Sequence, residues 1–390
     1  MSDTIEVGKC YIAWSKDEAT RDKGASGGFV TALMIAALKN NFVDNALIVK
    51  KRGVYEGVPE MTNDVEEVLK AAGSLHSAPV NLAKYVKKGS KVAMPAKPCD
   101  ARGVIEQAKR NQIDLSNVFL IGLNCGGSMS PVPTIRMVEE LYDLDPASVV
   151  GEEIIRGQLI FNTNDGEKAL KIDEVEDKGY GRRVSCRYCI TNIPEMADLA
   201  CGNWGVPKDK FGNATFVQVL TDKGIEIFKN AVDAGYIEFE SASEKSLKIR
   251  EKIDGTMKDL AEEWHKKVFS EVDSLPSSDR LAYYIEVFKN CIDCGSCRKI
   301  CPVCACGDDS KCLQMEYEDD SYKLSMFHMV RLLHLMDSCI GCGQCEEVCP
   351  VDIPLTMIHR RFAERMQSRL GHIPGMNMDR PPFYEVELRS

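Results

Sequence analysis

Short apolar runs alternate with amphipathic segments along the first half of the chain. The apolar runs end at polar or glycine-containing turns, as buried strands do, and the segments between them repeat apolar residues every three or four positions, as helices do. The pattern predicts strands at residues 44–49, 91–95 and 118–123, and helices at 26–39, 64–71, 79–87, 100–110 and 134–144. This alternation predicts an α/β domain with a mostly parallel sheet.

The pattern changes beyond residue 150. Residues 154–162 and 168–175 flank Asn164-Asp165-Gly166, which is a β-hairpin signal. The other segments are predicted to be a strand at 216–220, a charged and mostly helical stretch at 226–268, a linker at 274–279, and helices at 324–335 and 356–370.

Composition and charge narrow the class of protein. A chain of 390 residues with 44% hydrophobic residues suits two or three domains. Residues 1–9 are polar and lack the apolar region of a secretory signal. The longest nearly apolar run, 29–38, is about half of a membrane span. The net charge is −10 without blocks of Lys and Arg. We therefore expect a cytoplasmic protein without a membrane span or a nucleic-acid partner.

Cysteine is the strongest signal for chemistry. Eleven of the 17 cysteines follow residue 280, and clustered cysteines without a secretory signal indicate metal or redox sites. Two runs match C-x2-C-x2-C-x3-C-P. In such runs the first three cysteines hold one cubane and the fourth ligates the other cluster. The expected sets are Cys291, Cys294, Cys297 with Cys349, and Cys339, Cys342, Cys345 with Cys301.

Zinc is the alternative for these motifs, because zinc sites also use cysteine pairs. Two intact four-cysteine runs ending in Cys-Pro favour [4Fe–4S] clusters. Gly295, Gly341 and Gly343 suit the tight turns around a cluster. The additional cysteines are buried thiols, ligands of a further cluster or zinc, or contacts to a partner; they are Cys304, Cys306 and Cys312.

Further cysteines lie in the first half of the chain. Cys99 and Cys125 each follow a predicted strand, and the carboxyl ends of parallel strands meet at one edge of a sheet. Cys186 and Cys189 form a C-x2-C pair, and Cys201 lies shortly beyond. Two dispersed cysteines and a close pair suffice for one more [4Fe–4S] cluster. Ordinary buried cysteines are the alternative.

A glycine-rich segment, residues 24–28, opens the first predicted helix. Ser26 is the expected N-cap, and Gly27 with Gly28 leaves the helix N-terminus open to a phosphate. Close packing is the alternative reason for these glycines. Residues 72–74 and Asn124 lie near other predicted element ends and are expected to meet the same ligand.

The glycine-rich and cysteine-containing segments of the first half, in their order along the chain, resemble the beta-subunit family of F420-reducing hydrogenase and F420-dependent formate dehydrogenase. The resemblance covers roughly residues 8–270. The matching segments are Ser-Gly-Gly-Phe-Val-Thr-Ala-Leu at 26–33, Ala-Gly-Ser at 72–74, Pro-Cys at 98–99, Leu-Asn-Cys at 123–125, Arg-Val-Ser-Cys-Arg-Tyr-Cys at 183–189 and Ala-Asp-Leu at 197–199.

The resemblance implies one FAD and one [4Fe–4S] cluster in the first domain, and hydride exchange with the deazaflavin coenzyme F420. Three [4Fe–4S] clusters are then expected in all. The implied FAD site comprises Ser26, Gly27, Gly28, Thr31, Gly73 and Ser74, with Asn124 close by, and the implied cluster ligands are Cys99, Cys125, Cys186 and Cys189. This chain departs from the family pattern at Cys201, where a small polar residue is more frequent, and at Lys97, where a glycine is expected.

Domain order points to one branch of this family. The double cysteine motif follows the flavin domain, an arrangement most similar to the formate dehydrogenase beta subunit of methanogens. The expected division is a FAD- and [4Fe–4S]-binding domain at 1–225, a helical connector at 226–280 and a dicluster ferredoxin-like domain at 281–390.

The implied role is electron transfer from a catalytic alpha subunit, with a tungsten or molybdenum pterin, through the clusters to FAD and then as hydride to F420. The alternative is an electron-wiring subunit of an F420-linked hydrogenase or a heterodisulfide reductase assembly. Hydride transfer needs no catalytic acid, so none is nominated, and His76 is interpreted as structural. Residues 50–52 (Lys-Lys-Arg) either attract the anionic tail of the coenzyme or form a solvated turn.

Overall fold

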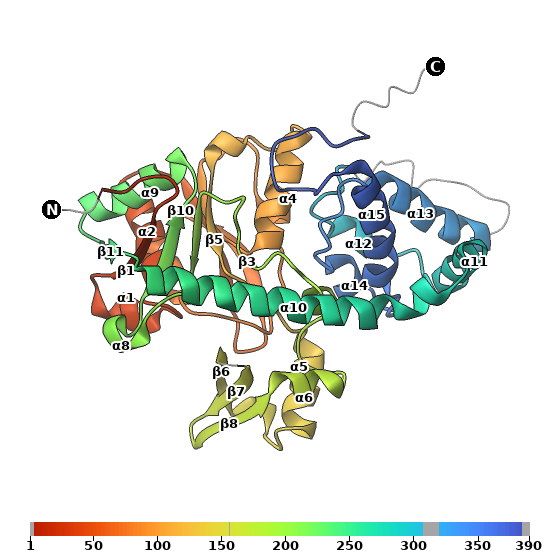
Figure 1. Cartoon of the computed structure of the whole chain (residues 1–390), viewed down its shortest axis with the longest axis horizontal. Coiled ribbons are helices and arrows are strands. Elements are labelled where there is room, and N and C mark those ends of the chain that lie inside the picture. The colour runs from red at the N-terminus through yellow and green to blue at the C-terminus, as the bar shows by residue number, and fades with distance from the viewer. Residues whose placement is uncertain (1–3, 156, 307–319, 384–390) are drawn as a thin grey trace.

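The structure is a computed structural model that describes residues 4–155, 157–306 and 320–383, apart from the side chains of residues 320–325. Two sheets and a helical C-terminal part make up these residues, and α4 lies between the larger sheet and the C-terminal helices (Figure 1). The strands are β1 (Cys10–Ser15), β2 (Asn45–Lys51), β3 (Gly57–Thr62), β4 (Val92–Ala96), β5 (Val118–Leu123), β6 (Val149–Ile155), β7 (Gln158–Thr163), β8 (Gly166–Lys171), β9 (Leu199–Gly202), β10 (Thr215–Val219) and β11 (Ile237–Ser241).

The helices range from single turns such as α7 to the long helix α10. The helices are α1 (Glu18–Lys23), α2 (Phe29–Lys39), α3 (Val65–Lys70), α4 (Pro98–Lys109), α5 (Pro131–Glu140), α6 (Ile172–Asp177), α7 (Val184–Arg187), α8 (Lys208–Phe211), α9 (Asp222–Asp233), α10 (Glu244–Ser274), α11 (Ser277–Phe288), α12 (Ser296–Lys299), α13 (Asp320–Leu335), α14 (Gln344–Glu347) and α15 (Leu355–Leu370). Three 3-10 turns, η1 (Leu82–Tyr85), η2 (Leu115–Asn117) and η3 (Pro146–Ser148), precede strands β4, β5 and β6 in turn.

The larger sheet has the order β11-β1-β10-β9-β5-β4-β2-β3. Its central strands β9, β5, β4 and β2 are parallel, which confirms the expected α/β fold, whereas the pairs on either side are antiparallel. Two successive antiparallel pairings, β9 to β10 and β10 to β1, leave β1 pointing the same way as the central strands. The carboxyl ends of these five strands therefore meet at one edge.

Helices cover both faces of this sheet. The apolar side of α2 and α9 packs on one face, where Phe29 and Phe228 meet edge to face with ring centroids 5.2 Å apart. On the other face, α4 buries Ala101 and Val104 against Met94 of β4. Apolar burial on both faces explains why the central strands are nearly continuous hydrophobic runs in the sequence.

The start of α2 differs from the prediction. Gly28, not Ser26, is the N-cap, with φ +66° and no side-chain hydrogen bond to the helix. The hydroxyl of Thr215 donates to the Ser26 carbonyl. A Cβ at Gly28 would lie 2.3 Å from the Thr20 carbonyl oxygen, and one at Gly27 would lie 2.6 Å from an Ala214 Cα. Close packing is thus sufficient reason for both glycines, and the Ser26 cap is a wrong prediction.

Other local predictions are mostly confirmed, with informative exceptions. The hairpin forms with Thr163 opposite Gly166, but its first strand begins only at Gln158, after β6 has ended, and its second strand ends at Lys171. Residues 79–87 form only the short turn η1. The mostly helical prediction for 226–268 is wrong where β11 pairs with β1. Strands β3 and β11 lie at the edges of the sheet and β9 has only four residues, so their patterns were too weak to predict them. Strand β1 was also missed, although it is an interior strand of six mostly buried residues.

The C-terminal part is an assembly of helices around its own core. Helix α10 continues to Ser274, and α11 begins at Ser277, so the predicted linker reduces to a break at Leu275 and Pro276. Pro276 lacks an amide hydrogen and cannot continue α10. The predicted helices at 324–335 and 356–370 are confirmed as α13 and α15. Among the described residues, no helix is both long and apolar enough to cross a membrane.

Substitutions at the start of α2 test the corrected cap. Gly28→Ala is expected to destabilise the chain by about 1–3 kcal/mol more than Gly371→Ala, because both positions have left-handed backbone but only Gly28 faces a close backbone atom. Ser26→Ala is expected to change stability by less than about 0.5 kcal/mol. Unfolding of each variant at matched iron content is the measurement. If Ser26→Ala lowers the unfolding free energy as much as Gly28→Ala does, the result would contradict Gly28 as the N-cap and support Ser26.

Candidate cluster and flavin sites

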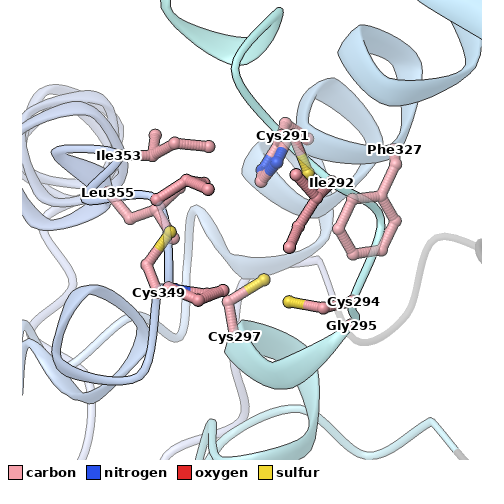
Figure 2. A pocket seen from close by; sticks show the side chains of 12 residues that line it. Cys291, Ile292, Cys294, Gly295, Cys297, Phe327, Cys349, Ile353 and Leu355 are labelled. Carbon is pink, nitrogen blue, oxygen red and sulfur yellow. The ribbon is translucent and has the colours of Figure 1, made fainter.

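The first cavity in the C-terminal part is lined by Cys291, Cys294, Cys297 and Cys349. The first two lie on the loop after α11, Cys297 lies in α12, and Cys349 follows α14. Figure 2 shows these four side chains around one space, with apolar side chains of the same lining beside them. Cys294 is exposed, so this cavity reaches the molecular surface. The structure thus brings together the first set of cysteines that the sequence predicts.

The second cavity is lined by the other predicted set, Cys301, Cys339, Cys342 and Cys345. Its thiols are strongly buried: burial raises the pKa of the Cys301 thiol to about 11 and that of the Cys342 thiol well above its ordinary value. Gly341 and Gly343 both have positive φ, as the tight turns around these cysteines require.

A third group of cysteines forms at the carboxyl edge of the large sheet. Cys99 lies in the first turn of α4 after β4, Cys125 follows β5, and Cys186 and Cys189 belong to α7 and the loop after it. Burial raises the pKa of Cys125 to about 12, and the nearby Cys186 adds to this effect. Burial also raises the pKa of Cys99, with smaller contributions from Cys125 and Cys186. The four thiols are therefore neighbours, although up to 90 residues separate them in the chain.

Basic side chains surround this third group. Although burial opposes ionisation, Arg183 and hydrogen bonds from Ser128 lower the pKa of Cys186. The Arg183 Nη2 lies 3.5 Å from the Cys186 Sγ, while its Nε and Nη1 have no hydrogen-bond partner among the described residues. Lys97 stands where a glycine was expected; burial opposes its charge, but Asp100 and Cys99 raise its pKa.

A buried cation with unpaired nitrogens also lies at the second cavity. Arg331 lines it and is 3% exposed, and its Nε and Nη1 have no hydrogen-bond partner among the described residues. Such a guanidinium is costly to bury unless an anion lies close. Thiolate-bound iron–sulfur clusters are anionic, so these cysteine and arginine side chains fit such clusters.

The remaining cysteines have different surroundings. Cys201 is fully buried in the apolar core under α2. Cys304 is partly buried beside the second cavity, Cys306 is exposed, and Cys312 lies outside the described residues. In the part of the chain that the structure describes, no three His, Cys, Asp or Glu side chains are arranged to hold a single metal ion.

Helix α4 joins the third cysteine group to the second cavity. Arg102 donates from Nε to the Pro374 carbonyl at 2.9 Å and from Nη1 to the Ile340 carbonyl at 3.2 Å. Gln107 donates to the Pro302 carbonyl at 2.8 Å. Ile340 and Pro302 both line the second cavity. These hydrogen bonds hold α4, which carries Cys99, against the wall of the second cavity.

Residues of the expected flavin site gather at the same sheet edge. Gly73 and Ser74 are exposed, and a Cβ at Gly73 would lie 3.0 Å from the Lys51 Nζ and 3.1 Å from the Lys23 carbonyl oxygen. The loop after α3 therefore meets the segment that leads to α2, which carries the other expected flavin residues. These are Ser26, Gly27, Gly28 and the buried Thr31.

Asn124 is the feature that best fits a bound ligand at this edge. Its side-chain oxygen and nitrogen are buried and have no partner among the described residues. The backbone amide of Asn124 donates to the Cys201 carbonyl, which fixes the residue at the ends of β5 and β9. Such a polar side chain suits FAD, whose ring and phosphates offer donors and acceptors.

Acidic side chains neutralise most of the positive charge at residues 50–52, the expected basic turn. Lys50 pairs with Glu67 at 2.7 Å and Glu60 at 3.2 Å, and Arg52 lies 3.7 Å from Glu56. Lys51 instead donates to the Ala72 carbonyl. His76 is held by its backbone amide, which donates to Glu152, and burial lowers the pKa of its ring. The structural interpretation of His76 agrees with these contacts.

Sequence reasoning missed the basic residues that face the cysteines. Arg102, Arg183 and Arg331 are distant in the chain from most of the thiols that they approach. A signal existed for Arg183, which stands three residues before Cys186. Arg331 lies within the helix predicted at 324–335, to which no role in binding a cluster was assigned.

Comparisons with known proteins agree with this arrangement. Two models of one family, coenzyme F420 hydrogenase/dehydrogenase beta subunit, match the chain: the N-terminal model at residues 10–87 and the C-terminal model at residues 89–245. A 4Fe-4S dicluster domain matches residues 287–353.

Curated relatives match over most of the chain. The F420-dependent formate dehydrogenase subunit beta of Methanocaldococcus jannaschii is 41% identical over 388 residues, covering 97% of this chain and 100% of the relative. The F420-dependent formate dehydrogenase 1 subunit beta of Methanococcus maripaludis is 40% identical, covering 95% and 96%. The coenzyme F420 hydrogenase subunit beta of Methanosarcina barkeri is 27% identical, covering 59% and 80%.

A solved structure shares the fold. A chain in the xenon-derivatised F420-reducing [NiFe] hydrogenase complex from Methanosarcina barkeri has a TM-score of 0.58 at 23% identity, covering 69% of this chain and 96% of that chain.

Close contact between the two parts of the chain can be tested at Gly343. A Cβ there would lie 2.2 Å from the Ser185 Oγ. Gly343→Ala is therefore expected to weaken the contact between the two parts of the chain. If its free energy falls by more than about 1.4 kcal/mol, proteolysis near Leu275 and Pro276 is expected to increase by about tenfold or more. Gly371→Ala is the control, because Gly371 also has positive φ but has open space around it. Equal cleavage of both variants would contradict the contact.

Proposed function

This chain belongs to the coenzyme F420 hydrogenase/dehydrogenase beta-subunit family, and from that premise we propose that it is the electron-transferring beta subunit of an F420-dependent formate dehydrogenase. In that role, [4Fe–4S] clusters supply one-electron transfer, and FAD supplies the exchange between single electrons and the hydride that coenzyme F420 carries. Formate oxidation then belongs to a separate alpha subunit with a tungsten or molybdenum pterin.

The observation that carries the proposal is the order of the three cysteine groups. Arg331 lines the second cavity and donates to the carbonyl of Cys297, which lines the first. Arg183 acts electrostatically on both Cys99 and Cys342, which belong to the third group and the second cavity. The groups therefore form a series from the exposed Cys294 to the flavin edge of the sheet.

Each cysteine group has a definite role in this proposal. The two C-terminal sets hold one cluster each, with Cys349 and Cys301 exchanged between motifs. Cys99, Cys125, Cys186 and Cys189 hold the third cluster. Support for the third set is its burial beside Arg183 and Lys97, which offset the negative charge of a thiolate-bound cluster.

Residues at the carboxyl edge of the larger sheet are proposed to bind FAD. Asn124 is proposed to hydrogen-bond FAD, and Gly73 and Ser74 to line its entrance together with the segment 26–31. Lys51 supplies positive charge at this edge, although burial lowers its pKa. The opposite end of the series, at Cys294, is proposed to face the alpha subunit. A heterodisulfide reductase is a further proposed partner in the assembly, and the cytoplasm is the proposed location.

Metal content tests the cluster assignment. The unmodified chain, purified without oxygen, is expected to contain about twelve iron atoms and little zinc, because three cubanes hold about four each. Cys186→Ser is expected to lower the iron content by about four atoms. Cys201→Ser, a matched change in the apolar core, is expected to retain all of it. Full iron content in Cys186→Ser would remove that residue from the ligand set, and zinc in place of iron would end the proposal.

Reduction of the coenzyme tests the enzymatic role. The chain reduced with dithionite is expected to bleach the visible absorbance of oxidised F420. Asn124→Ala is expected to weaken FAD binding about five- to thirtyfold, since one or two hydrogen bonds of about 1 kcal/mol are lost. Asn117→Ala, at an exposed turn, is the control. A chain that retains FAD and yet fails to bleach F420 would contradict this role.

A further inference from the structure

Two buried histidines line the two C-terminal cavities. His328 of α13 lines the first cavity, with Cys291, Cys297 and Cys349. His359 of α15 lines the second. Their ring centroids lie 6.5 Å apart, so the pair connects the walls of the two cavities.

Buried ring nitrogens of both histidines lack hydrogen-bond partners among the described residues. His328 is 0% exposed, and neither of its ring nitrogens has a partner among the described residues. His359 is 4% exposed, and its Nε2 likewise has no partner in that part of the chain. Buried polar atoms without partners are rare and costly, so each needs an explanation.

The packing around His328 fixes the orientation of its ring. The ring is stacked on Phe288, with centroids 4.3 Å apart and planes 12° apart, and it meets Phe327 edge to face. Phe327 borders the same cavity, as Figure 2 shows. A phenylalanine would satisfy this apolar packing without unpartnered nitrogens. The presence of an imidazole therefore points to a polar partner inside the cavity.

We propose that His328 and His359 each donate an N–H hydrogen bond to a sulfur atom of the cluster in the cavity that they line, and thereby raise its reduction potential. An imidazole carries at least one N–H whether neutral or protonated. Hydrogen bonds to the sulfur atoms are among the factors that set cluster potentials, because they stabilise the more negative reduced state. In this role the two histidines tune the clusters of the relay and carry no electrons themselves. This inference rests on the proposed function, since it requires clusters in both cavities.

Substitutions in the full chain separate the hydrogen bond from the packing. His328→Phe keeps an aromatic ring on Phe288 but removes the N–H, and His328→Gln keeps an N–H. EPR-monitored redox titration is expected to show about tenfold weaker reduction of one cluster in His328→Phe, which is about 59 mV for one electron. His328→Gln is expected to restore part of this shift. His359→Phe is expected to lower the potential of the other cluster.

The matched control is His265→Phe. His265 lies on α10, its Nε2 is 2.9 Å from Glu364, and it lines neither cavity. This variant is expected to leave both potentials unchanged. If it shifts them as much as the cavity variants do, the effect is a general one of packing and the inference is overturned.

A measurement on the unmodified chain covers the case in which a variant fails to fold. The chain is labelled with 15N-histidine, and hyperfine spectroscopy of the reduced clusters is expected to detect weak 15N coupling. Full iron content with no such coupling, or with unchanged potentials in both Phe variants, overturns the inference alone and indicates water as the partner of the rings. Absence of iron from the unmodified chain overturns the proposed function and this inference together.

Discussion

The contact between α4 and the C-terminal helices is the constraint on which the electron path depends. Electron transfer between cofactors slows steeply with distance, so cysteine groups in separate parts of a chain are useful only if those parts are held tightly together. Arg102 and Gln107 bind backbone carbonyls across this contact, and Gly343 lets the cluster turn approach Ser185 with no side chain between them. The large sheet with its helices and the helical C-terminal part thus lie side by side, as Figure 1 shows for α4, α12 and α15.

Electrostatics impose a second constraint on the same region. Thiols in an apolar interior resist ionisation, as the raised pKa values of Cys125 and Cys301 indicate. Cluster ligands must nevertheless be thiolates. Buried cations resolve this conflict, and Arg183 at the sheet edge and Arg331 at the second cavity are the main examples. The side chains that would offset the charge of the proposed clusters also interact with neighbouring cysteine groups, so one set of residues would serve both charge compensation and positioning.

Local patterns predicted the parts of the site that lie close together in the chain. The C-x2-C-x2-C spacing reflects the geometry of one cubane corner, which a single tight turn can provide, and the cavities contain the cysteine sets expected from it. The ends of β4 and β5 likewise indicated where Cys99 and Cys125 lie, because parallel strands share a carboxyl edge. Local reasoning failed at Ser26, where close backbone packing, rather than capping, determines the start of α2. It also failed at β11, whose strand form depends on pairing with β1 more than 200 residues away.

The amino-acid order therefore specifies the cysteine turns, the α/β alternation and the family, since each of these depends on residues within one element or on a linear pattern. The meeting of Cys186 with Cys99, the placement of arginines beside thiols and the isolation of the two cavity histidines arise from packing between distant elements. No linear pattern encodes these features, because burial and charge at a site are sums over neighbours that the chain brings together only after folding.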